Sequence, residues 1–62
     1  MDNLREVFLK AFANVPLNLR DEIILVLKER GPISWNVAYV EVKTDSPLSV
    51  VILEELKLLN LI

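Results

Sequence analysis

The stretch Asn18-Leu-Arg-Asp-Glu-Ile-Ile-Leu-Val-Leu-Lys-Glu-Arg-Gly-Pro-Ile-Ser34 decides the fold. Asn18 is a good helix N-cap, acidic residues follow it, and basic residues come at the far end, which is the charge order that complements a helix dipole. A Gly-Pro pair is typical of a helix end. The stretch therefore predicts a helix over residues 19–30. Its inward-facing residues would be Ile23, Ile24, Val26 and Leu27, with Leu25 on the outer face.

A second interpretation of the same stretch stays open. Residues 23–28 are rich in β-branched side chains, which favour strands. Such a strand would pair across the Glu29-Arg-Gly-Pro32 segment with a strand over residues 33–43. The caps and the charge order favour the helix over this hairpin.

Three more helices are expected from apolar spacing and capping residues. Residues 3–14 carry an apolar stripe at helical spacing, in which the two Phe side chains are expected to pack in the core. Ser34 is a suitable cap for a helix over residues 35–43, and Ser46 followed by Pro47 is typical of a helix start. The last helix is expected to run from Pro47 to about residue 59. The predicted fold class is thus all-α, a compact four-helix domain of helix-turn-helix type.

The composition favours self-association or a protein partner. The chain has 62 residues, enough for one domain, and 53% of them are hydrophobic. Its mean hydropathy is +0.42, and so small a domain has too little interior to bury that much apolar surface. The helices leave four apolar residues facing outward, and these are the expected protein interface: Leu25, Val50, Val51 and Leu58.

The residue types present argue against several kinds of site. The chain has no Cys and no His, so neither a transition-metal site nor the usual bases and nucleophiles of enzymes are expected. Its single Gly argues against a loop that cradles phosphates. We therefore expect no catalytic residues, no metal and no small-molecule cofactor.

Neither a membrane nor a secretory route is expected. No apolar run approaches the roughly 20 residues of a membrane-spanning helix. The first residues lack the basic start and apolar block of a signal peptide, so a cytoplasmic location is expected.

Two segments, Lys28-Glu-Arg-Gly-Pro-Ile-Ser34 and Leu59-Asn-Leu-Ile62, resemble the winged-helix family of DNA-binding domains. The resemblance covers about two-thirds of the chain and implies a helix-turn-helix unit, which is expected to be a minimal one without the wing that the family would begin at Ile62. It also implies a DNA-binding transcription regulator. The contacts to DNA would then come from Lys43, Ser46, Ser49 and Lys57.

The presumed recognition helix departs from the family in its first turns. Residues 47–51 read Pro-Leu-Ser-Val-Val, of which only Ser49 could hydrogen-bond a base edge. The net charge of −2 also disfavours binding to phosphates. The leading hypothesis is therefore a small helix-turn-helix-like module for protein interaction or dimerisation, and DNA-binding regulation is the alternative.

Overall fold

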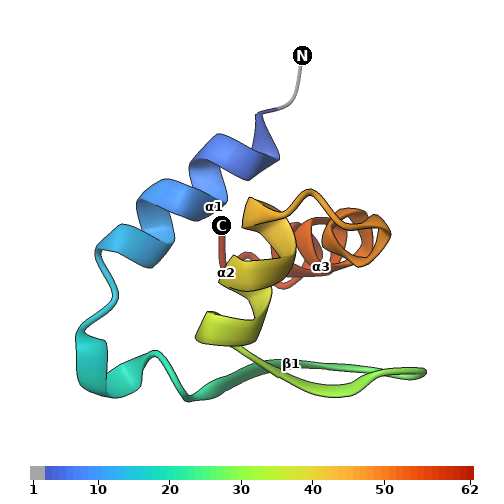
Figure 1. Ribbon diagram of the computed structural model, residues 1–62, viewed down its shortest axis with the longest axis horizontal. Coiled ribbons are helices and arrows are strands. Elements are labelled where there is room, and N and C mark those ends of the chain that lie inside the picture. Colours follow the sequence, from blue (N-terminus) through green and yellow to red (C-terminus); the bar gives the residue numbers. More distant parts are fainter. Residues whose placement is uncertain (1–2) are drawn as a thin grey trace.

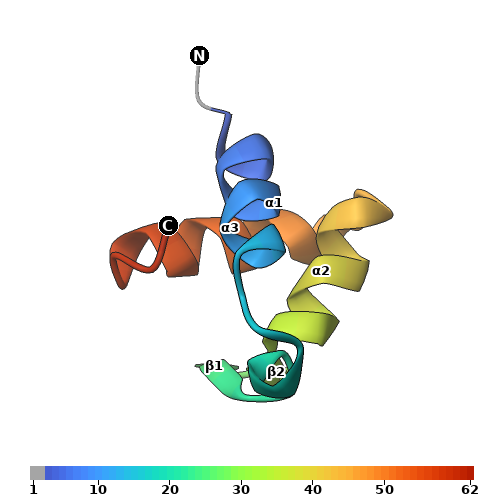
Figure 2. The ribbon, with the colours of Figure 1, turned by 90° about the vertical axis from the view of Figure 1, so that its left-hand side faces the viewer.

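The computed structural model of the chain describes residues 3–62. Within that range three α-helices and a short 3-10 helix accompany a two-stranded antiparallel sheet. Figure 1 and Figure 2 both show the hairpin at one end of the molecule, with the three helices grouped at the other. In chain order the elements are α1 (Leu4–Ala13), η1 (Leu17–Leu19), β1 (Ile23–Leu27), β2 (Gly31–Ser34), α2 (Trp35–Lys43) and α3 (Pro47–Leu58).

The predicted all-α fold is wrong, because a β-hairpin occupies most of the stretch expected to form a helix over residues 19–30. Burial in β1 follows strand alternation: Leu25 and Leu27 are buried, whereas Val26 is 70% exposed. The chain is therefore a small α/β domain. The alternative hairpin has its first strand where expected, but its second strand ends at Ser34 and residues 35–43 are helical.

Leu27 and Gly31 face each other across the two strands, and the three residues between them form the hairpin turn. Gly31 has a φ of +89°, a backbone conformation that only Gly adopts at little cost. The Gly-Pro pair that predicted a helix end therefore closes a turn instead. The register then pairs Leu25 with Ile33 and shifts between Ile23 and Leu25.

The helices α2 and α3 begin at the residues predicted to cap them. The Ser34 side chain accepts a hydrogen bond from the Val37 N–H, and the Ser46 side chain accepts one from the Ser49 N–H. A three-residue turn joins the two helices, and in it Asp45 has a φ of +55°. A helix–turn–helix connection is thus present, although the domain around it is not all-α.

The hydrophobic core lies between the hairpin and the three helices. Both Phe side chains of α1 are buried in it, as expected. Trp35 and Tyr39 are half-buried and pack against the core. The buried apolar residues are Phe8, Phe12, Leu25, Leu27, Ile33, Ala38, Val42, Ile52 and Leu56.

Candidate functional site

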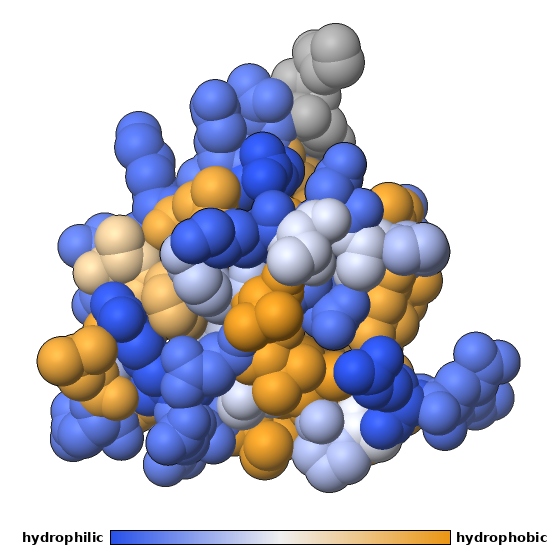
Figure 3. Space-filling view, in the orientation of Figure 1, coloured by the Kyte–Doolittle hydropathy of each residue, from blue (hydrophilic) through white to orange (hydrophobic). Residues whose placement is uncertain are grey.

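The outward face of α3 is the strongest candidate for a functional surface. Ile52 and Leu56 of this helix are buried in the core and Leu53 packs against it, so the opposite side of the helix points outward. Three aliphatic side chains are exposed there, Val50 at 56%, Val51 at 44% and Leu58 at 79%. We call these three residues the α3 face. They were expected to be exposed. Figure 3 shows hydrophobic areas separated by hydrophilic ones on one side of the molecule.

The fourth predicted interface residue lies elsewhere. Leu25 is buried in the core, with only 6% of its surface exposed. Its expected position on an outer face followed from the helical interpretation of residues 19–30. In a strand, Leu25 and its neighbour Val26 point to opposite sides, and Val26 is the exposed residue of the two.

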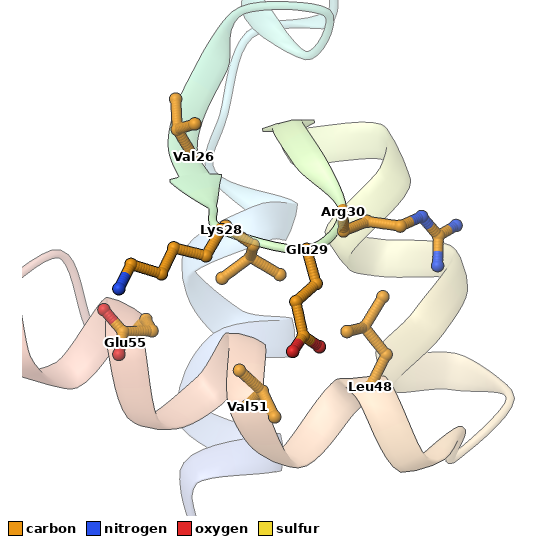
Figure 4. A pocket seen from close by; sticks show the side chains of 8 residues that line it. Val26, Lys28, Glu29, Arg30, Leu48, Val51 and Glu55 are labelled. Atoms are coloured by element: carbon orange, nitrogen blue, oxygen red, sulfur yellow. The ribbon is translucent and has the colours of Figure 1, made fainter.

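A groove separates the hairpin turn from α3. Its apolar lining includes Val26 on the hairpin together with Leu48 and Val51 on α3. Figure 4 shows Glu29 extending toward these two α3 side chains, while Lys28 extends toward Glu55. The groove therefore connects exposed apolar residues of β1 with the α3 face and has charged side chains around it.

Sequence reasoning missed this groove. The helical interpretation placed Val26 on the inward face of a helix. No pattern in the sequence indicates that the hairpin turn lies near α3. The β-branched content of residues 23–28 was the one signal for a strand, in which Val26 would point to the side opposite Leu25 and Leu27. Even then, only the three-dimensional structure brings that residue to the same groove as Val51.

Neither serine proposed to contact DNA presents an uncommitted hydroxyl. Ser49 is only 3% exposed, and its Oγ donates to the Ser46 carbonyl oxygen over 2.6 Å. The Ser46 Oγ donates to a carboxylate oxygen of Glu41 and accepts from the Ser49 N–H. Both hydroxyls thus stabilise the start of α3.

The two proposed DNA-contacting lysines are exposed, and Lys43 lies next to the turn that contains Ser46, whereas Lys57 lies toward the other end of α3. The Lys43 ammonium lies 5.6 Å from the centroid of the Tyr39 ring, at the end of α2. Lys57 lies near the far end of α3, beside Leu58 in a shallow pocket. Lys57 is ten positions after Pro47 in the helix, about 15 Å along the axis.

The guanidinium groups of two arginines donate hydrogen bonds to backbone carbonyl oxygens and so stabilise the fold. Arg5 donates to the carbonyl oxygens of Val42 and Lys43 over 3.2 and 3.3 Å, which ties α1 to the end of α2. Arg20 donates to two carbonyl oxygens near the end of α1. These side chains satisfy backbone acceptors at helix ends, so the surface positive charge available to a phosphate backbone is reduced.

Residues 3–62 contain neither a cluster of metal ligands nor a helix that could span a membrane. Among these residues, no group of three or more His, Cys, Asp or Glu side chains is placed to hold a metal ion. None of the helices in the same range is long and apolar enough to cross a membrane.

The comparisons with known proteins add no relative. The chain matches no protein-family model, and it is similar to no characterised protein and to no solved structure.

Proposed function

We propose that this chain is a small protein-interaction module whose contact surface is the α3 face. The observation that carries the proposal is the aliphatic character of this face on α3, the second of the two helices that the three-residue turn joins. Val50 and Val51 are exposed where a base-reading helix would present hydrogen-bonding side chains.

The energetics favour covering this surface with protein. Removing apolar surface from water contributes about 25 cal/mol per Å², and Val50, Val51 and Leu58 each expose at least 44% of their surface. The groove beside Val51 extends the apolar area toward the hairpin. A partner that covered both would bury one connected surface.

The test combines an apolar dye with sedimentation velocity on the purified chain. We expect the fluorescence of 8-anilinonaphthalene-1-sulfonate to rise when the chain is added. We also expect self-association to increase with the concentration of the chain. The double variant Val50→Lys/Val51→Lys should reduce both signals. Val40→Lys is the matched control, because Val40 is 54% exposed on α2. A chain that stays monomeric at millimolar concentration and does not bind the dye would refute the proposal.

A second candidate function is a DNA-binding regulator. The specific observation in its favour is the three-residue turn between α2 and α3, the connection found in helix-turn-helix proteins. Lys43 and Lys57 would then contact the phosphates. Ser46 and Ser49 would not touch DNA and would only stabilise the start of α3. The engaged hydroxyls of Ser46 and Ser49 make this candidate the weaker one.

Fluorescence anisotropy of a labelled duplex tests the second candidate at low and near-physiological salt. Sequence-dependent binding that survives the higher salt would support DNA recognition. The Lys43→Ala and Lys57→Ala variants should then each reduce the salt slope by about one. An unchanged salt slope would show that the substituted lysine does not contact the DNA.

A further inference from the structure

The outer edge of β1 is open. The strand reads Ile-Ile-Leu-Val-Leu from Ile23 to Leu27, with no charged residue and no proline. Within residues 3–62, its backbone makes no hydrogen bond to any element other than β2. Natural proteins usually protect such an edge with a charge, a proline, a bulge or a covering segment. β1 has no charge and no proline, and its irregularity is the register shift between Ile23 and Leu25, so the stretch from Leu25 to Leu27 is the regular part of the edge.

The other edge of the hairpin is protected. β2 contains Pro32, which has no N–H to offer a further strand, and β2 also packs against α2. The last residue of β2, Ser34, already caps that helix. An added strand would therefore pair with β1 and not with β2.

Charges at the two ends of β1 indicate which strand would fit. Glu22 precedes the strand and Lys28 follows it, and both residues are exposed. In an antiparallel pair of β1 strands centred on Leu25, Glu22 of each copy would stand opposite Lys28 of the other. A parallel pair would place like charges side by side, which is destabilising.

The neighbouring charges do not cancel this complementarity. Lys28, Glu29 and Arg30 form the hairpin turn, and Lys28 is the one directly next to the last residue of β1. Figure 4 shows the Glu29 side chain directed toward α3, and Arg30 lies 3.8 Å from the Glu41 carboxylate. Asp21 accepts a hydrogen bond from the Asn36 side chain. Glu22 and Lys28 are thus the charged residues that directly flank β1, and Lys28 would turn from Glu55 toward the edge to meet Glu22 of the other copy.

We propose that a second copy of this chain pairs antiparallel with β1, so that two hairpins form one four-stranded sheet. The inference rests on the proposed function and names its partner. Symmetric pairing satisfies the edge backbone groups of both copies at once. The groove at Val26 and Val51 makes the edge continuous with the α3 face. The apolar surface next to the paired strands would therefore lie within or beside the same interface.

Charge exchange at the edge tests this pairing by sedimentation equilibrium. The variants are Glu22→Lys, Lys28→Glu and the double variant carrying both. Each single variant places like charges opposite each other at two symmetric positions, so the dimer dissociation constant should rise about tenfold or more at low salt. The double variant should recover the wild-type value. Lys10→Glu, an exposed charge reversal on α1, should leave dimerisation unchanged.

The double variant also distinguishes the loss of pairing between two copies from repulsion within one copy. Lys28 extends toward Glu55 of its own chain (Figure 4). A loss caused by repulsion from Glu55 would persist in the double variant, whereas a loss caused by mispaired copies would be reversed. Circular dichroism of each variant establishes that the fold is kept.

The remaining outcomes distinguish this inference from the proposed function. A wild-type chain that is monomeric at millimolar concentration overturns the pairing, while dye binding lost in Val50→Lys/Val51→Lys still supports an interaction surface for another protein. A dimer that is insensitive to the edge charges, but broken by the α3 variants, overturns the pairing and supports the proposed function. A monomer that does not bind the dye overturns both.

Discussion

The guanidinium carbon of Arg20 lies 4.3 Å from the centroid of the Phe12 ring, and Tyr39 stacks on the same ring at 4.4 Å. Arg20 also donates to the carbonyl oxygens of Phe12 and Val15. One side chain thus satisfies acceptors near the end of α1 and covers an aromatic residue of the core. It joins the first helix to the segment that leads into the hairpin.

We expect Arg20→Ala to lower the free energy of unfolding by about 2 kcal/mol, because a cation–π contact and two charge-assisted hydrogen bonds are lost together. Arg20→Lys should lose more than half of that amount, since an ammonium group cannot reproduce the planar fork. Urea denaturation followed by tryptophan fluorescence gives both values. Arg30→Ala is the control, because its exposed ion pair should contribute less than about 1 kcal/mol. Equal losses for the two arginines would contradict the role assigned to Arg20.

Ser46→Ala should destabilise the domain by about 1 kcal/mol, the usual cost of removing a helix N-cap. Its hydroxyl accepts from the Ser49 N–H at the start of α3 and bonds to Glu41. Ser46→Asn should stay close to wild type, because Asn is an equally good cap. Thermal unfolding measures the difference between the two variants. Equal melting temperatures for the Ala and Asn variants would show that the Ser46 side chain does not stabilise α3 as a cap.

Gly31→Ala should cost about 1 kcal/mol through the backbone alone, because an added Cβ would meet no atom within 4 Å while φ is +89°. Gly31→Asn should lose less, since Asn tolerates a positive φ better than Ala. Urea denaturation compares the two variants. A Gly31→Ala variant as stable as wild type would show that the turn does not need this conformation.

The helices α2 and α3 were predictable because their signals are local. Ser34 and Ser46 each bond to a backbone N–H only three residues ahead, so residue identity and spacing were sufficient. The α3 face followed from the same periodicity, and Val50, Val51 and Leu58 are exposed as expected.

The hairpin was not predictable with the same rules, because its turn uses residues that also suit a helix end. Basic side chains followed by Gly31 and Pro32 complement a helix dipole, yet here they form and close a three-residue turn. The outcome depends on pairing Leu25 with Ile33 and on packing against the core, neither of which a local pattern reports. The position of Leu25 was wrong for this reason, and the groove beside Val26 was missed.

The contact between Arg20 and Phe12 was missed for a related reason. The two residues are eight positions apart and are separated by the break at Pro16, so no helical spacing relates them. Only the path of η1 brings Arg20 back over α1.

Substitutions in β1 distinguish the hairpin from the helix that the sequence first favoured. The helix would expose Leu25 and bury Val26, whereas the structure exposes 6% of Leu25 and 70% of Val26. We expect Leu25→Ala to cost about 3 kcal/mol and Leu25→Val about 1 kcal/mol, because both open space in the core. Val26→Ala should cost about 0.5 kcal/mol or less, as is usual at an exposed position. Urea denaturation of the three variants measures the order, and Leu25→Val keeps the comparison usable if Leu25→Ala does not fold. A larger loss for Val26→Ala than for Leu25→Val would overturn the strand and restore the helix.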